Sequence, residues 1–295
     1  MSISFDFRKW IKDESEQRRR GDAAHPGGYA YTADEKVRRV LGALGPVKLA
    51  TEATVRLWNT TARADLLGSA VRVGPNQFKE IHELVSGCAR TLGIAMPAVY
   101  IQPNPGAVNA MTLGTEDDGI IIITSAAVDH MSPEELRFIV GHECGHIQHG
   151  HVTYMTVLHY LMNTASYFLR WIVTPALMAL NSWKRRAEVT CDRAGLVCVG
   201  DLDLAVKTLV KLALGSQKLY DQINMDEYLK QLDDLRGGVG QYAEFNKSHP
   251  YLPKRVKALQ LFAKSLYFRV RVLKKDGGLP KEILDERVSE VLGVG

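Results

Sequence analysis

The residues in this 295-residue sequence that could do chemistry are concentrated in His142-Glu143-Cys144-Gly145-His146. Residues four apart lie on the same face of an α-helix, so the two imidazoles can converge on one metal ion. Glu143 lies about 100° further around the helix, where its carboxylate can reach a water on the metal without binding the metal itself. The pattern predicts a hydrolytic metal site with His142 and His146 as ligands and Glu143 as general base.

A catalytic zinc site takes three protein ligands and a water, so two histidines leave one position to fill. Glu188 is the best candidate, because it opens Glu188-Val-Thr-Cys-Asp192, in which two acids again lie four apart on one helical face. Asp192 could then accept the free N–H of a ligand imidazole and fix its tautomer. The alternative for this pair is a solvated acidic pair among neighbouring arginines. The other candidates for the third ligand are His149, His151, Cys144 and Cys191.

These other candidates have weaker support. The longer pattern HExxHxxGxxH would need a histidine at position 152, where this chain has Val152, so His149 and His151 do not match it. Cys144 lies half a turn away from the face that carries the two histidines. Zinc is inferred over other divalent metals from the types of ligand.

The motif needs a helix that holds it in a fixed orientation. Ser132-Pro133-Glu134-Glu135 is a strong helix start, with Ser132 as N-cap, Pro133 at the first helical position and acids in the first turn. We expect this helix to continue to about Gly150.

Around this helix, the sequence predicts further helices within residues 34–92 and from about residue 152 to near the end. Three short strands are expected at 98–102, 108–114 and 119–124. The last is an unbroken β-branched run, Gly119-Ile-Ile-Ile-Ile-Thr124, typical of a strand covered on both faces. Residues 1–32 are charged and then rich in turn residues, so we expect a flexible or loosely docked arm, followed by a single domain over 33–295.

HExxH followed by ExxxD is the signature of the gluzincin zinc peptidases, and the wider sequence resembles the family of HtpX and the CaaX prenyl endopeptidases. The resemblance runs from about Ala70 to Arg255. It includes Val108-Asn109-Ala110, residues 138–147, the Cys-Asp-Arg-Ala-Gly context of Asp192, and Ser248-His249-Pro250 with Arg255.

This resemblance implies an α+β, mostly helical, zincin-like domain with a small sheet beside the HExxH helix. It also implies a metalloendopeptidase with one Zn²⁺ per chain and a protein or peptide substrate. His249 matches a family histidine near the active site and would donate to the oxyanion, although a plain turn histidine is the alternative. Arg255 would assist it or brace its loop. Asn109 and Ala110 match the family's edge strand, which would bind substrate by strand addition, the alternative being an ordinary edge strand.

Composition narrows the partners and the compartment. The net charge of +4 is too small to indicate nucleic-acid binding. The four cysteines form no CxxC pair and the N-terminus lacks a signal peptide's apolar core, so we expect reduced thiols and a cytoplasmic protein. Residues 152–183 are strongly apolar but contain Arg170, which favours a buried helix pair over a membrane span, with peripheral membrane contact as an alternative.

The chain also lacks the N-terminal spans of the membrane-embedded family members, so it resembles the compact bacterial ones most. Two other classes of function remain open at this point. One is a non-catalytic, zinc-stabilised chaperone, which the intact Glu143 argues against. The other is a membrane-surface interaction protein that works through residues 152–183.

Overall fold

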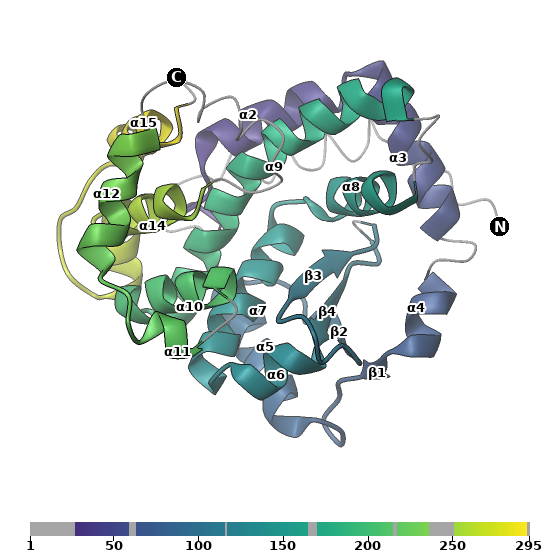
Figure 1. Ribbon diagram of the computed structural model, residues 1–295, viewed down its shortest axis with the longest axis horizontal. Helices are drawn as coiled ribbons and strands as arrows, with labels where there is room; N and C mark the ends of the chain where they lie inside the picture. Colours follow the sequence, from purple (N-terminus) through teal and green to yellow (C-terminus); the bar gives the residue numbers. More distant parts are fainter. Residues whose placement is uncertain are drawn as a thin grey trace.

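The computed structural model describes residues 27–58, 63–115, 117–164, 170–214, 217–235 and 251–293. Helices surround a small sheet, which lies against one side of the central helix α7 (Figure 1). The elements in chain order are α2 (Thr32–Leu41), α3 (Gly45–Leu57), α4 (Arg63–Ser69), β1 (Val71–Arg72), α5 (Lys79–Leu92), β2 (Ala98–Gln102), β3 (Ala110–Leu113), β4 (Ile120–Thr124), α6 (Ser125–His130), α7 (Pro133–Gln148), α8 (Val152–Thr164), α9 (Arg170–Val199), α10 (Leu202–Leu214), α11 (Gln217–Tyr220), α12 (Met225–Leu235), α14 (Leu252–Phe262), the π-helix η2 (Phe268–Val272) and α15 (Lys281–Leu292). The expected α+β class is confirmed.

The sheet has four strands in the order β1-β2-β4-β3. Strand β4 pairs in parallel with β2 and antiparallel with β3, with Met111 opposite Ile122. All five residues of β4 are buried, and they alternate between two cores: Ile121 and Ile123 face the main core, whereas Ile120 and Ile122 pack with Trp58. The strand is therefore covered on both faces, as its composition predicts, and β3 is left with a neighbouring strand on one side only.

Helix α7 begins where its capping signal places it. The backbone N–H of Glu135 donates to the Ser132 hydroxyl at 3.3 Å, and the N–H of Ser132 donates to the Glu135 carboxylate at 2.8 Å. This reciprocal cap, together with Pro133, fixes the first turn and hence the direction in which every later side chain of α7 points. Lys211 of α10 binds the same carboxylate at 2.8 Å and so holds α10 against α7.

Helices α7 and α9 are in very close contact because glycine lies where they cross. A Cβ added to Gly145 would come within 2.7 Å of the Cβ of Ala194. One added to Gly195 would come within 2.8 Å of the carbonyl oxygen and the ring of Phe138. The backbones can approach this closely only without those methyl groups, and the approach brings the HExxH face of α7 against α9.

The described residues within 152–183, which are 152–164 and 170–183, are helical. Helix α8 ends at Thr164, and α9 starts at Arg170 and continues to Val199, so Glu188 and Asp192 lie on this same long helix. None of the described helices has an apolar stretch long enough to cross a membrane. Contact of residues 152–183 with a membrane surface stays a prediction.

The ends of the described chain meet in the main core, which includes both Tyr29 and Leu292. Residues 1–26 of the predicted arm lie outside the described residues. The last part of that arm is packed rather than loose, because Tyr29 and Tyr31 are 1% and 0% exposed. Arg193 of α9 explains this packing: it donates to the Tyr29 carbonyl and pairs with Asp285 of α15 at 2.8 Å.

Candidate metal centre

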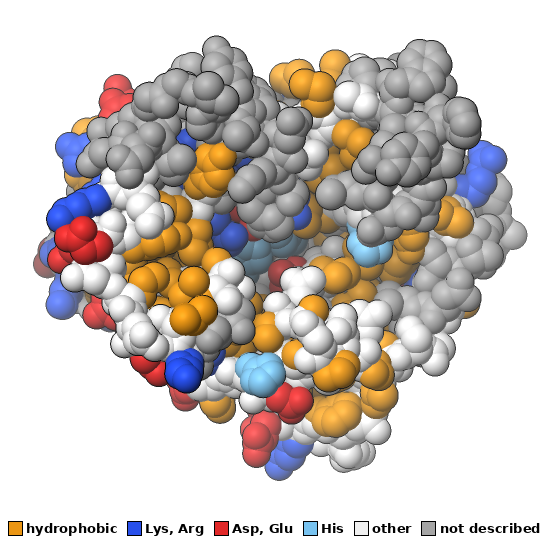
Figure 2. Space-filling view, viewed as in Figure 1, with side chains coloured by type: hydrophobic (Ala, Val, Ile, Leu, Met, Phe, Trp, Pro, Cys, Tyr) orange, Lys and Arg blue, Asp and Glu red, His pale blue; other side chains and the backbone are white. Residues whose placement is uncertain are grey.

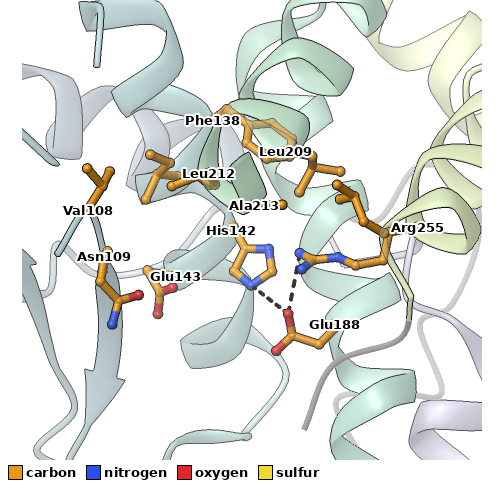
Figure 3. Close-up of a pocket in the computed structure, with 13 residues that line it drawn as sticks. Val108, Asn109, Phe138, His142, Glu143, Glu188, Leu209, Leu212, Ala213 and Arg255 are labelled. Atoms are coloured by element: carbon orange, nitrogen blue, oxygen red, sulfur yellow. Dashed lines mark ion pairs between the residues drawn. The ribbon is translucent and has the colours of Figure 1, made fainter. Parts of the chain in front are cut away.

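A cavity of about 390 Å³ lies between α7, α9, α10, α14 and the start of β3. Figure 2 shows a hollow in the middle of the face that it draws, with histidine and acidic side chains at the floor of the hollow. Figure 3 shows the polar side chains on one side of the cavity and apolar ones above them. The lining residues are Val108, Asn109, Ala110, Phe138, Ile139, His142, Glu143, Glu188, Leu209, Leu212, Ala213, Leu252 and Arg255.

Two of the residues that line this cavity, His142 and Glu188, lie close to the buried His146, which is not itself part of the lining. The Nε2 atom of His142 lies 3.6 Å from one carboxylate oxygen of Glu188, and the Nε2 atom of His146 lies 3.9 Å from the other. Glu188 is 2% exposed and His146 is 1% exposed. One turn of α7 and one residue of α9 thus bring together the two imidazoles and the carboxylate that the sequence predicts as ligands.

The other nitrogen of His142 contacts a second carboxylate. Its Nδ1 lies 3.0 Å from Asp192 Oδ1, and Arg255 binds both oxygens of Asp192 at 2.8 and 2.6 Å. Burial alone would raise the pKa of Asp192, but the charge and hydrogen bonds of Arg255 hold it below its usual value. Burial would lower the pKa of His142, and the Asp192 hydrogen bond and the Glu188 charge raise it instead. This carboxylate fixes the ring of His142 so that Nε2 points at Glu188.

Arg255 comes from α14, 63 residues after Asp192 in sequence, and reaches the same centre. Its Nη2 lies 3.4 Å from Glu188 as well as 2.6 Å from Asp192. The side chain therefore connects the two acids of the ExxxD motif, as the dashed line from Arg255 to Glu188 in Figure 3 indicates in part.

Glu143 faces the cavity from α7 and is held by a residue that the sequence analysis did not single out. The Thr112 hydroxyl of β3 donates to Glu143 Oε2 at 2.6 Å. Burial raises the pKa of Glu143, and the charge of Glu188 adds to this effect, while His142 and the Thr112 hydrogen bond oppose it. Thr112 is 0% exposed, and the signal that could have found it is a buried polar residue within an otherwise apolar strand.

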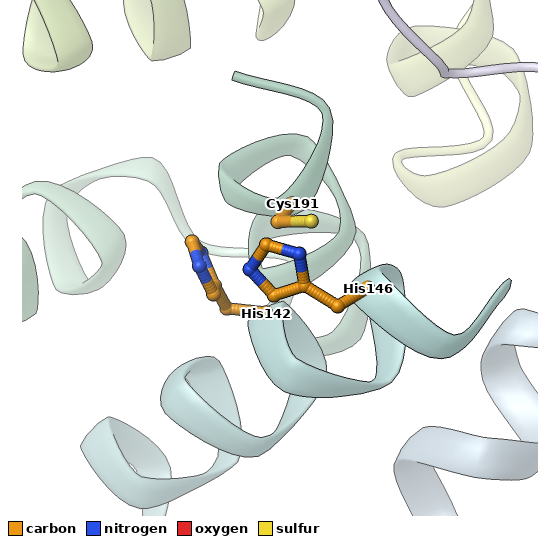
Figure 4. A group of neighbouring side chains, drawn as sticks. All are labelled: His142, His146 and Cys191. Carbon is orange, nitrogen blue, oxygen red and sulfur yellow. The ribbon is translucent and has the colours of Figure 1, made fainter. Parts of the chain in front are cut away.

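A different trio, His142, His146 and Cys191, has possible ligand atoms that all lie within 4.8 Å of one another (Figure 4). Two observations favour Glu188 over Cys191 as the third ligand. The Cys191 sulfur lies 3.6 Å from His151 Nδ1, which is itself 3.2 Å from His146 Nδ1, so the thiol is on the side of His146 away from Nε2. Burial also raises the pKa of Cys191 well above its usual value, as does the charge of Glu188, which disfavours the thiolate that binds metals.

The remaining predicted residues fall into two groups. Asn109 and Ala110 both line the cavity, and Ala110 opens the edge strand β3. Asn109 is fixed next to β4, because its N–H donates to the Thr124 hydroxyl at 3.0 Å and its carbonyl accepts from the Thr124 N–H at 3.0 Å. His249 lies outside the described residues.

Comparison with known proteins gives the family. Residues 75–263, well over half of the chain, match Peptidase family M48. The chain belongs to peptidase family M48. Its expected relationship to HtpX and its enzyme class, a metallopeptidase, are therefore confirmed, and metallopeptidases of this family depend on a metal ion.

Two kinds of relative illustrate how this M48 chain compares. It is 29% identical to the plastoglobule-localized metallopeptidase 48, chloroplastic, of Arabidopsis thaliana over 215 residues, which are 69% of this chain and 62% of that protein. It is 24% identical to protease HtpX of Haemophilus influenzae over 232 residues, 69% of this chain and 81% of the relative. The chain thus spans less than two thirds of the Arabidopsis protein. Among solved structures, none matches this chain significantly.

One residue near the centre, Asp34, lies before the segment that matches family M48. Asp34 of α2 precedes it by about forty positions, yet its carboxylate lies 3.1 Å from His151 Nε2. No local pattern around Asp34 distinguishes it from the other acids of the first helix. Only the packing of α2 against α9 shows that this acid belongs near the metal centre.

Proposed function

We propose that this M48 chain is a zinc-dependent endopeptidase. Its metal ligands are His142, His146 and Glu188. Glu143 is the general base, and Asp192 and Arg255 support the ligands. The observation that supports this most strongly is the proximity of two imidazole Nε2 atoms to the oxygens of one buried carboxylate. This group lies beside an open cavity that His142, Glu188 and Glu143 line.

The donor set fits a zinc ion. Zinc bound by nitrogen and oxygen at tetrahedral angles holds its ligand atoms about 3.4 Å apart. Glu188 places one oxygen 3.6 Å from His142 Nε2 and its other oxygen 3.9 Å from His146 Nε2. Glu143, Glu188 and Asp192 are all at most 6% exposed. Buried carboxylates that outnumber the neighbouring guanidinium of Arg255 need further positive charge, which a divalent cation supplies.

The residues of the chain divide the reaction between them. A bound zinc ion supplies Lewis acidity, which polarises the scissile carbonyl and makes water acidic near neutral pH. Glu143 removes the proton from the attacking water and later gives it to the leaving amine. Thr112 holds Oε2 of Glu143, which leaves Oε1 to take that proton. Asp192 and Arg255 keep the ring of His142 in place throughout.

Substrate binding is proposed at the edge strand. Strand β3 has a neighbouring strand only at β4, and its first residue borders the cavity. An extended peptide that adds to this edge gains main-chain hydrogen bonds and lies across the Glu143 carboxylate. The opposite wall, with Leu209, Leu212 and Leu252, offers apolar surface to the side chains of that peptide.

His249 is proposed as the donor to the oxyanion on the strength of the family resemblance alone. Loss of one such donor usually lowers kcat by roughly 10²–10³. A His249→Ala variant that keeps its zinc but not its kcat supports this role, and an unchanged kcat removes His249 from the site.

Glu143→Gln tests the proposed function directly. The variant should retain zinc and fold, because glutamine has nearly the same shape, and should lose about 10²–10⁴ in kcat/KM because its amide cannot accept the proton. The measurements are zinc content of the purified protein and cleavage of casein or a peptide library. Wild-type turnover in the variant contradicts the proposal, as does a zinc-loaded wild type that cleaves none of these substrates.

A further inference from the structure

The Nδ1 atom of His146 faces a second histidine rather than a carboxylate. It lies 3.2 Å from Nδ1 of His151, which immediately precedes α8 and is fully buried. On the other side of that imidazole, Nε2 lies 3.1 Å from Asp34 Oδ2, close enough for an ion pair but without the geometry of a hydrogen bond. His146, His151 and Asp34 thus form a row that leads from the metal centre to helix α2.

Asp34 is held in a single orientation from two directions. The Trp183 indole N–H donates to Oδ1 at 2.9 Å, and the Thr190 hydroxyl donates to Oδ2 at 2.7 Å. Burial alone would raise the pKa of Asp34, but the neighbouring His151 and the hydrogen bond from Thr190 lower it. The group at this end of the row is therefore a carboxylate that can only accept hydrogen bonds.

The positions of protons along this row follow from that acceptor. Because the Asp34 carboxylate faces Nε2 of His151 at 3.1 Å and can only accept, a neutral His151 carries its proton there and presents a lone pair at Nδ1. That lone pair can accept only from a protonated Nδ1 of His146. The Nε2 of His146 is then left with a lone pair that points toward Glu188, which is the tautomer a metal ligand needs.

We propose that Asp34, acting through His151, is the positioning residue that holds metal ligand His146 in the tautomer and ring orientation required for zinc. The inference rests on the proposed metal centre and adds to it a residue outside residues 75–263 that match the family. The two ligand histidines are then supported differently: His142 by a direct carboxylate, Asp192, and His146 by a carboxylate one imidazole further away.

Cys191 is the one competing donor to His151 Nδ1 among the described residues, since its sulfur lies 3.6 Å away. A thiol is a weaker donor than an imidazole N–H. The longer contact and the weaker donor both favour His146 as the partner of His151.

Zinc affinity of the full chain, measured by competition with a chromogenic chelator, tests the proposal. Asp34→Asn and His151→Leu should each weaken zinc binding by roughly 10–100-fold, the usual loss for a partner behind a metal ligand. The double variant should bind zinc no more weakly than His151→Leu alone, because both changes act through one nitrogen of His146. Losses that multiply in the double variant overturn the proposal.

Asp285→Asn is the matched control. Asp285 is also a buried acid that anchors α2, because it accepts from the N–H and hydroxyl of Thr32, but it does not contact the row. This control should lower the melting temperature of the metal-free protein and leave zinc affinity within about two-fold. An equal loss of affinity in Asp285→Asn would show that docking of α2 matters and that the Asp34 carboxylate has no specific part.

Two further measurements keep the proposal testable if Asp34→Asn folds poorly. His151→Gln retains an acceptor toward His146 and a donor toward Asp34, so it should recover most of the affinity that His151→Leu loses. In the metal-free protein, nitrogen-15 NMR shifts should show the proton of His146 on Nδ1 in the wild type and redistributed toward Nε2 in His151→Leu. A proton on Nε2 in the wild type overturns the proposal, whereas a wild type without zinc affinity overturns the metal centre itself.

Discussion

At the scale of single residues, each side chain of the proposed centre is held in its orientation by a hydrogen-bonding partner from elsewhere in the chain. His142 is fixed by Asp192, Asp192 by Arg255, and Glu143 by Thr112. Each of these partners comes from a different element from that of the residue it supports. A change in a supporting residue should therefore alter affinity or turnover while the ligands remain in place.

Two variants test whether Glu188 or Cys191 is the third ligand. Glu188→Ala should lower zinc affinity by more than the roughly 10–100-fold that a lost supporting hydrogen bond costs, because a ligand itself is removed. Cys191→Ser should leave affinity nearly unchanged, since the thiol lies on the far side of His146. Metal analysis after dialysis against a defined free-zinc buffer measures the zinc affinity of both variants. A larger loss in Cys191→Ser than in Glu188→Ala would make Cys191 the third ligand instead of Glu188.

Thr112 gives a prediction about the base. Thr112→Val keeps the shape of the side chain but removes the 2.6 Å hydrogen bond to Glu143. Loss of a hydrogen bond to a charged group costs about 1.5–3 kcal/mol, so we expect kcat to fall roughly 10–100-fold with zinc affinity unchanged. Thr112→Ser should retain most of the activity. A kcat that is the same in both variants would mean that Thr112 does not position the base.

The proximity of His142, Glu143 and His146 could be predicted from sequence, for a physical reason. His142, Glu143 and His146 lie within five positions on a helix with an unambiguous cap, so spacing alone places them on related faces. Thr112, His151 and Asp34 reach the same centre only through tertiary packing, and spacing carries no information about that. Glu188 is intermediate, because its ExxxD pattern predicts a helical face but not the helix that this face meets.

At the scale of elements, the contact between α7 and α9 positions the ligands. Strong local signals made α7, α5 and β4 predictable from capping, from 3.6-residue periodicity and from an unbroken β-branched run. The two-residue strand β1 has no such signal, because its residues Val71 and Arg72 are exposed and it exists only by pairing with β2. The closeness of α7 to α9 depends on glycines whose role becomes clear only when both helices are seen together.

Gly145→Ala tests that closeness. The added methyl group would meet Ala194 Cβ at 2.7 Å and must push α9 away. Overpacking of this kind costs about 1–3 kcal/mol, typically more than the roughly 1 kcal/mol that alanine gains over glycine within a helix. We expect a lower free energy of unfolding and weaker zinc binding, because Glu188 moves with α9.

Gly68→Ala is the control for this change. An added Cβ at Gly68 in α4 meets nothing within 4 Å, so that variant should be neutral or slightly more stable. Urea unfolding of both proteins gives the comparison. Equal stability of the two variants would show that α9 accommodates the methyl group without moving.

At the scale of the whole molecule, the metal centre joins segments from most of the described chain. The proposed ligands come from α7 and α9, and their supporting residues come from β3 and α14. Helix α2 is bound to both α9 and α15 through Asp34 and Asp285. A metal ion bound to the folded chain therefore stabilises the assembly of these elements and not one helix alone.

Metal removal should accordingly lower global stability. At a free zinc concentration about 100 times the dissociation constant, binding contributes about 2.7 kcal/mol to the folded state. Removal with a chelator should then lower Tm by roughly 5–10 °C for a chain of this size. Glu188→Ala should show little further decrease with the chelator, and calorimetry with and without chelator measures both. A wild-type Tm that does not respond to the chelator contradicts the proposed centre.

The position of β3 at the edge of the sheet has a consequence for the choice of substrate. A polypeptide can pair with this strand only where its own N–H and C=O groups are not already occupied. Helices and the inner strands of native proteins have theirs occupied, so they are excluded whatever their side chains. If substrate pairs with β3 as proposed, the edge selects first by conformational state: locally unfolded segments and extended tails would be cleaved, and intact globular proteins would not.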